Sequence, residues 1–221
     1  MEGAALVMDF DGTILDTEEP VYRSWVELWE EHGQDLVRAE WQAIIGTDGS
    51  FDPWVSLERR IGRPLDPALA ERRRARRDEL QAAHEMRPGV VEWLAAADEL
   101  GVPVGVASSS PAAWVEAHLA RLGIRERFRS LVCCDVEVPA KPDPTSYRLV
   151  CEQLGADPTR SVAVEDSPHG IAAAVGAGLF TVAVPHALTA DLDLSAADVI
   201  VPSLEALTLP EALTAAGARP C

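Results

Sequence analysis

Residues 6–18 read LVMDFDGTILDTE, and this stretch decides how the rest of the chain is interpreted. Asp9 and Asp11 stand one residue apart where an apolar run ends, and such a run is typical of a buried strand. Because alternate residues of a strand share one side, we expect both carboxylates to face one site and Phe10 to point away into the core. A strand end needs no such density of acid, so the pattern indicates a function.

The rest of the chain alternates between helix and strand. An all-helical segment separates the first strand from the others, and this order predicts an α/β protein with a parallel sheet covered on both faces. We expect a doubly wound, Rossmann-like core of residues 1–16 and 86–221, with a helical cap inserted after the first strand at residues 17–85. The expected strands are 5–8, 102–107, 131–134, 161–164, 180–184 and 199–201, and the expected helices are 21–29, 41–45, 54–61, 67–84, 90–97, 112–122, 147–154 and 171–177.

The composition excludes several classes of partner. A formal net charge of −17 at pH 7 and a pI near 4.6 argue against a nucleic-acid binder. Apolar runs are too short to span a bilayer, so we expect no membrane partner. The four cysteines lack CxxC spacing, and reduced thiols in a cytoplasm are the simplest interpretation. We therefore expect a cytoplasmic monomer.

The basic residues are nearly all arginine. Lysine and arginine total 19, and Lys141 is the only lysine in the sequence. The ammonium of lysine is a compact point charge, whereas the guanidinium of arginine is a planar fork, so the two cannot replace each other at every site. The one position that keeps lysine is therefore a candidate for a site that requires a compact ammonium. Chance is the alternative interpretation of a single residue.

Four polar clusters follow expected strands, at the carboxyl ends where parallel α/β sheets bind ligands. They are Asp9–Thr13, Ser108–Ser110, Lys141 in the loop after the third strand, and Glu165–Asp166. Carboxylates brought together repel each other unless a cation intervenes, and Mg²⁺ prefers oxygen ligands of this kind. The candidate metal ligands are Asp9, Asp11, Glu165 and Asp166.

The remaining groups can bind a phosphate. Ser108 precedes an expected helix, and the backbone N–H groups of Ser109 and Ser110 lie between them. This arrangement is typical of an anion-binding site. Gly12 permits a sharp turn, and Thr13 can offer its N–H and hydroxyl to an anion. Lys141 would place a point charge on the same phosphoryl oxygens. Together with a carboxylate that can attack phosphorus, these parts indicate an enzyme of phosphoryl transfer.

The motifs themselves carry a resemblance. DFDGT (9–13), ASSS (107–110), KPDP (141–144) and VEDSPHGIAAAVGAG (164–178) occur in the order seen in haloacid dehalogenase superfamily phosphatases. The chain resembles the subgroup with a helical cap after the first strand, which includes β-phosphoglucomutases as well as sugar-phosphate and phosphoglycolate phosphatases.

The resemblance implies roles for these residues. Asp9 is the expected nucleophile, which forms an aspartyl-phosphate, and Asp11 is the expected general acid and then base. The expected ligands of Mg²⁺ are Asp9, the backbone carbonyl of Asp11, and Asp166. Glu165 is expected either to bind the ion directly or to contact one of its ligands. The resemblance assigns Ser108 and Lys141 to the phosphoryl group.

The resemblance also narrows the reaction. Dehalogenases and phosphonatases of this superfamily lack an acid at the position of Asp11, so phosphate ester chemistry is expected. Mutases carry a histidine in the first cap helix, where this chain has Val21, and an arginine in a cap loop, whereas residues 46–52 contain none. We expect a Mg²⁺-dependent hydrolase, with a β-phosphoglucomutase-type mutase as the alternative.

The substrate is the most open part of the interpretation. The resemblance implies a small phosphorylated metabolite, the phosphate of a sugar, polyol, organic acid or nucleoside. Arg76, in a cluster of arginines on the long cap helix, and Gly46, in the cap loop, are the candidate substrate contacts from the cap. A solvated helix face and an ordinary turn are the alternatives for these two positions.

Overall fold

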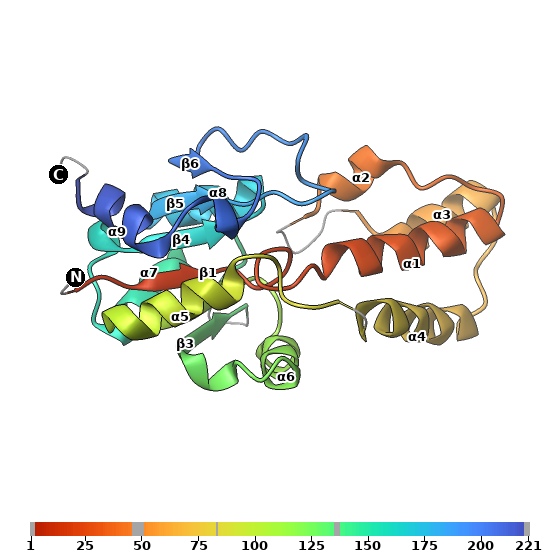
Figure 1. Ribbon diagram of the computed structural model, residues 1–221. Helices are drawn as coiled ribbons and strands as arrows, with labels where there is room; N and C mark the ends of the chain where they lie inside the picture. Colours follow the sequence, from red (N-terminus) through yellow and green to blue (C-terminus); the bar gives the residue numbers. More distant parts are fainter. Residues whose placement is uncertain (1–2, 46–50, 83, 135–137, 219–221) are drawn as a thin grey trace.

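A computed structural model describes residues 3–45, 51–82, 84–134 and 138–218 of the chain. Figure 1 shows two parts, a sheet flanked by helices, which carries both ends of the chain, and a set of helices to one side of it. We call the second part the helical insert and define it as helices α1 to α4.

The sheet is parallel throughout, with the strand order β3-β2-β1-β4-β5-β6. From β1, the next strands along the chain, β2 and β3, are added on one side, and β4, β5 and β6 are added on the other. Doubly wound sheets bind their ligands at such a switch point, here between β1 and β4. The strands are β1 (Leu6–Met8), β2 (Val104–Ser108), β3 (Phe128–Cys133), β4 (Val162–Glu165), β5 (Phe180–Ala183) and β6 (Val199–Ile200).

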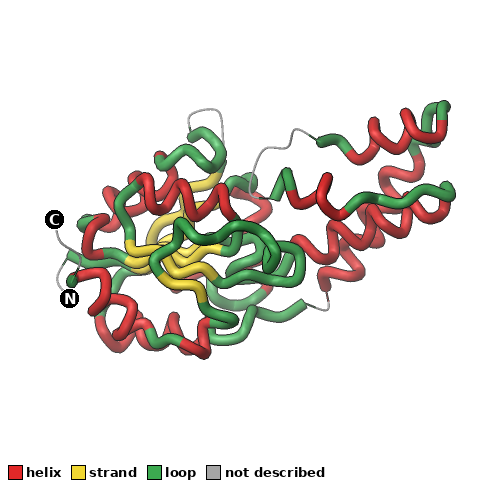
Figure 2. The backbone as a smooth tube through the Cα atoms, turned by 90° about the horizontal axis from the view of Figure 1, so that it is seen from above, coloured by secondary structure: helices red, strands yellow, loops and turns green. Residues whose placement is uncertain are grey.

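The two faces of the sheet pack on different helices. In β1, Leu6 and Met8 belong to the apolar core on one face, and Val7 to the core on the other, as the period of two requires. Helices α5 (Val90–Leu100), α6 (Ala112–Arg121) and α9 (Leu209–Gly217) cover the first face, and α7 (Thr145–Leu154) and α8 (Pro168–Gly176) cover the second. All six strands thus lie at the centre of a layered structure, which Figure 2 shows from above.

The helical insert has its own apolar core. It comprises α1 (Glu18–Glu31), α2 (Arg38–Gln42), α3 (Pro53–Ile61) and α4 (Ala68–Ala82). Trp29 and Leu57 are fully buried among these helices, and Leu188, from the loop after β5, joins the same cluster. The insert therefore has an apolar core of its own, to which the sheet part contributes Leu188.

These findings confirm the predicted fold class, a doubly wound parallel sheet with a helical cap after the first strand. The division at residues 17 and 85 stays a prediction. β3 begins at Phe128, three residues earlier than expected, and helix α9 was not expected although Thr208 and Glu211 form a capping box at its start. None of the helices in the described residues combines the length and the hydrophobicity needed to cross a membrane.

Candidate active site

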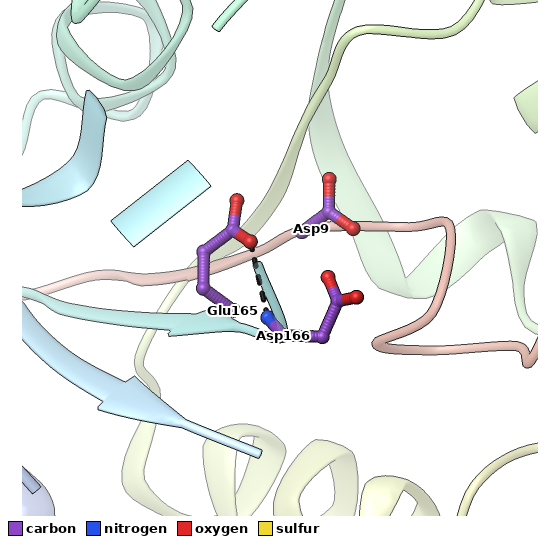
Figure 3. Close-up of side chains that lie close together, drawn as sticks. All are labelled: Asp9, Glu165 and Asp166. Carbon is purple, nitrogen blue, oxygen red and sulfur yellow. Dashed lines mark hydrogen bonds between the residues drawn. The ribbon is translucent and has the colours of Figure 1, made fainter. Parts of the chain in front are cut away.

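Three carboxylates meet where β1 and β4 end side by side. The two strands are in register from Leu6 with Val162 to Met8 with Val164, so Asp9 and Glu165 leave the sheet at the same level. One oxygen from each of Asp9, Glu165 and Asp166 lies within 4.8 Å of the others, and all three side chains are buried. Figure 3 shows the three side chains lying close together, where β1 and β4 end. Phe10 is fully buried in the core, as expected.

The lone lysine lies among these acids. Lys141 comes from the loop between β3 and α7 and is only 4% exposed. Its Nζ donates hydrogen bonds to Asp9 Oδ1 and to Glu165 Oε1, the latter at 2.6 Å. Glu165 Oε1 also accepts from the Tyr147 hydroxyl at 2.6 Å, and Oε2 accepts from the backbone N–H of Asp166 at 3.1 Å. Glu165 is therefore already used as the group that holds Lys141 in place.

The charges of this cluster depend on each other. Burial, with the negative charges of Glu165, Asp166 and Asp11, raises the pKa of Asp9 well above its ordinary value, although Lys141 acts in the opposite direction. Burial disfavours the ammonium of Lys141, but Asp9 and Glu165 outweigh it and raise the pKa of that lysine. The site thus holds more negative charge than one ammonium can balance, and the addition of a cation would favour an ionised Asp9.

The turn after β1 brings Asp166 against the backbone. Gly12 has a φ of +83°, and a Cβ at this position would lie 2.5 Å from Asp166 Oδ2. The Thr13 hydroxyl donates to Asp166 Oδ1 at 3.4 Å, and the Thr13 N–H is used within the turn, on the carbonyl of Phe10. Gly12 and Thr13 therefore shape the turn and support Asp166, and neither of them lines the cavity where we expected them to bind an anion.

The Asp166 carboxylate has a second neighbour, from the loop after β5. His186 Nε2 lies 3.0 Å from Asp166 Oδ2, and both side chains are buried. The Nδ1 of the same ring accepts from the backbone N–H of Leu188 at 3.3 Å, so Nε2 can carry the proton that Asp166 accepts. His186 thereby orients Asp166.

Asp11 is surrounded differently from Asp9. Its carboxylate accepts from the hydroxyls of Thr17 and Ser110, at 2.7 and 2.6 Å, and from the indole N–H of Trp114 at 2.9 Å. These donors are neutral, whereas Asp9 lies against an ammonium. The Asp11 side chain is outside the group of three carboxylates, so its place as a metal ligand through the backbone carbonyl stays a prediction.

A cavity of about 80 Å³ opens between these groups. Ser108 and its neighbours close one side of it, with the Ser108 hydroxyl accepting from the Ser110 N–H at 3.0 Å and the Ser109 hydroxyl accepting from the Lys141 N–H at 3.1 Å. The structure therefore brings together Asp9, Asp11, Ser108–Ser110, Lys141 and Asp166. The cavity is lined by these residues together with Glu18, Ile45 and Ser167.

The two candidate contacts from the cap behave differently. Arg76 is not brought to this cavity, because its guanidinium donates to both carboxylate oxygens of Glu27 at 2.9 and 3.1 Å and lines a separate hollow between α1 and α4. The alternative interpretation, a solvated helix face paired with nearby acids, agrees with this placement. Gly46 lies outside the described residues.

Several residues of the site were not expected from the sequence, and Glu18, Trp114 and His186 are three of them. Glu18 lines the cavity, and burial, with repulsion from Asp11 and Asp166, raises its pKa to about 8. Trp114 and His186 reach the site from α6 and from the loop after β5. His186 follows the end of a strand, which is the signal that identified the other clusters, while no local pattern marks Trp114.

Comparisons with known proteins agree with this geometry. A family model described as haloacid dehalogenase-like hydrolase matches residues 4–178. YhcW of Bacillus subtilis is 40% identical over 189 residues, which cover 85% of this chain and 86% of YhcW. The fructose-1-phosphate phosphatase YqaB of Escherichia coli is 33% identical over 186 residues, 82% of this chain and 96% of YqaB.

A solved structure extends the likeness to the fold. CbbY from Rhodobacter sphaeroides, crystallised in complex with phosphate, is 31% identical, with a TM-score of 0.73 over 95% of this chain and 98% of that one. Sequence and fold thus point to the same family over most of the chain. The chain belongs to the haloacid dehalogenase-like hydrolases, and within them it is a phosphatase.

Proposed function

We propose that this phosphatase is a Mg²⁺-dependent phosphomonoester hydrolase that acts through an aspartyl-phosphate on Asp9. One observation carries the proposal. The Asp9 carboxylate lies at the switch point of the sheet, between Lys141 and the Asp166 carboxylate, and it lines a small cavity that Ser108 also lines. A candidate nucleophile, a fixed ammonium and serine hydroxyls therefore line one small cavity.

The residues present fit a magnesium ion. Buried carboxylates in excess of the available positive charge are a suitable donor set for a small, hard cation. Asp9 and Asp166 would hold it. The Glu165 oxygens already accept three hydrogen bonds, so Glu165 would not bind the ion itself and would hold Lys141 and the Asp166 N–H in place. When bound, the ion supplies positive charge to the phosphoryl oxygens and to Asp9.

The chain's own residues account for the two chemical steps. In the first, an Asp9 oxygen attacks phosphorus, the bond to the ester oxygen breaks, and Asp11 gives its proton to the leaving alcohol. In the second, Asp11 takes a proton from water, the water oxygen attacks phosphorus, and Asp9 is released with inorganic phosphate. Lys141 and the Ser108 hydroxyl stabilise charge on the phosphoryl oxygens in both steps.

The lining of the cavity favours a substrate without a second negative charge near phosphorus. Asp11 and Glu18 face the space beside the phosphoryl position, and among the described lining residues Lys141 is the only cation. Lys141 is already paired with Asp9 and Glu165. The described lining therefore offers no second cation to another anionic group, whereas substrate hydroxyls can form hydrogen bonds with Asp11 and Glu18. We propose a neutral sugar or polyol phosphate as the substrate, in agreement with the activity that YqaB's name states.

Hydrolysis is favoured over the mutase alternative. Val21 stands where mutases carry a histidine, and residues 46–52 contain no arginine that could bind a second phosphate. Cytoplasmic location and a monomeric state stay predictions.

Removal of divalent metal tests the cofactor. EDTA should abolish phosphate release, and Mg²⁺ should restore it, since Asp9 is then ionised in a site rich in negative charge. Ca²⁺ should restore much less, because it prefers a larger and looser set of ligands. Release of phosphate at the full rate in metal-free buffer would contradict the proposal.

The covalent step is tested with two separate variants. Asp9→Asn should form no phosphoenzyme, because the attacking carboxylate is gone. Asp11→Asn should still be phosphorylated slowly by p-nitrophenyl phosphate, whose leaving group needs little help from an acid. Radiolabel trapped on acid-quenched protein measures both, and label on Asp9→Asn would show that another residue is the nucleophile.

Substitution of the buried lysine tests the need for a compact ammonium. Lys141→Arg should lower kcat by about 10²–10³, because a planar fork does not fit between Asp9 and Glu165. Arg76→Lys is the matched control, since it exchanges the same two side chains on the insert, outside the cavity, and should leave kcat near that of the unmodified enzyme. Equal kinetics for Lys141→Arg and the unmodified enzyme would make the lysine a compositional accident.

A pair of substrates tests the preference for neutral compounds. The kcat/KM for glycerol phosphate should exceed that for phosphoglycolate by about tenfold or more, because the described lining of the cavity offers no further cation to the carboxylate of phosphoglycolate. Phosphate release under identical metal concentrations measures the ratio. A ratio of one or below would contradict the proposed substrate class and leave the hydrolase assignment intact.

A further inference from the structure

Arg87 bridges two segments of the sheet part with a single guanidinium. From Nη1 it donates to the carbonyl oxygens of Gly12 and Val184, the latter at 2.8 Å, and from Nη2 it donates to that of Pro185 at 2.8 Å. Gly12 lies in the turn after β1, whereas Val184 and Pro185 begin the loop after β5. The planar group of one side chain therefore fixes the distance between this turn and this loop.

Both segments contact the Asp166 side chain. In the turn, the Gly12 backbone lies against Asp166 Oδ2, and the Thr13 hydroxyl donates to Oδ1 at 3.4 Å. In the loop, His186 Nε2 lies 3.0 Å from Oδ2. Asp166 is thus held between two segments that Arg87 joins to each other.

The hold on His186 is direct. The carbonyl of Pro185 and the N–H of His186 belong to one planar peptide group. Arg87 donates to the carbonyl, and the N–H donates to the Thr189 hydroxyl at 3.0 Å. The imidazole that meets Asp166 is therefore attached to a peptide plane that is fixed on both sides.

The position of Arg87 is fixed by its own backbone. Its N–H donates to the Ile14 carbonyl at 2.9 Å, and the preceding residue, Met86, pairs with Leu15 in an isolated bridge. A half-buried charge needs hydrogen bonds in place of its hydration, and the fork of a guanidinium can direct several N–H groups at carbonyl oxygens in fixed directions. Lysine carries a point charge on a flexible stem, so it cannot reproduce this bridge.

We propose that Arg87 is a positioning residue for the metal ligand Asp166, which it holds in place by joining the turn at Gly12 to the loop that carries His186. The inference rests on the proposed function, in which Asp166 holds Mg²⁺. Loss of a hydrogen-bond partner that orients a metal ligand costs about 10–100-fold in metal affinity. Arg87 acts one contact further from the ion, so the lower end of this range is expected.

Binding of Mn²⁺ to the metal-free protein tests this role without a substrate. Mn²⁺ takes the same kind of oxygen ligands as Mg²⁺, and electron paramagnetic resonance measures its free and bound fractions. The Mn²⁺ that Asp166→Asn fails to bind defines the site and separates it from ions held by surface acids. Arg87→Lys should raise the Kd of that site about tenfold, because an ammonium cannot join the turn and the loop as the guanidinium does.

Arg125→Lys is the matched control. The Arg125 guanidinium also donates to a backbone carbonyl, that of Phe128 at 3.0 Å, but it lies in the 3₁₀ turn before β3. Its Mn²⁺ affinity should equal that of the unmodified protein. A purely structural role for Arg87 would lower the melting temperature of the metal-free protein and leave the Kd unchanged, and this result would overturn the inference. If Arg87→Lys has no cooperative thermal transition, Arg87→Gln provides the same comparison.

A double substitution tests the route through His186. In a His186→Ala background, Arg87→Lys should raise the Kd by less than about threefold, because the contact that Arg87 supports is already gone. A tenfold increase in both backgrounds would overturn this route. If the unmodified protein has no Mn²⁺ site that depends on Asp166, the metal site of the proposed function fails together with the inference, whereas a site unaffected by Arg87→Lys refutes the inference alone.

Discussion

One buried ammonium between two carboxylates is the interaction on which the site depends. Lys141 joins Asp9, at the end of β1, to Glu165, at the end of β4, and its own loop follows β3. Burial of three charged groups is costly unless each is paired and hydrogen-bonded, and here the Tyr147 hydroxyl and the Asp166 N–H complete the pairing at Glu165. The cluster therefore locks three loops into one arrangement.

The same cluster leaves no space for larger side chains nearby. A Cβ on Gly170, in the first turn of α8, would lie 2.0 Å from Glu165 Oε1, and a Cβ on Gly12 would lie 2.5 Å from Asp166 Oδ2. Gly170 thus allows the backbone of α8 to approach Glu165, and Gly12 allows the turn after β1 to approach Asp166. The geometry of the carboxylates is set by this close packing as much as by their charges.

Two carboxylates that are neighbours in the sequence are given different chemistry by their surroundings. Asp9 is buried against an ammonium and other acids, which suits the proposed nucleophile beside a cation. Asp11 faces neutral donors, two hydroxyls and an indole, which suit a group that must gain and lose a proton. The separation of roles comes from the elements that pack against each residue.

Hydrogen bonds join the helical insert and the turn after α2 to the loop after β5 and to the start of α8. The Gln42 amide donates to Asp191 at 2.7 Å and to the Leu188 carbonyl at 2.8 Å, both in the loop after β5, which also supplies His186. The Nδ1 atom of His169, at the start of α8, lies 3.2 Å from the Ile45 carbonyl oxygen. These contacts place the insert over the cavity, so residues from both parts line it.

The sequence by itself determined the alternation of strands and helices from β1 to β6, the parallel sheet and the polar clusters that follow its strands, because the periods of helix and strand and the rule of strand ends act locally. It also identified Lys141 as exceptional through composition alone. Only the tertiary structure decided which partner each acid has. Trp114 donates a hydrogen bond to Asp11, 103 residues away in the sequence, and Lys141 donates to Glu165, 24 residues away. Such pairs depend on how the helices and loops pack on the sheet, and a single sequence holds no local signal for that packing. The same is true of Arg76, which pairs with Glu27 at a hollow between α1 and α4 and does not line the cavity of the site.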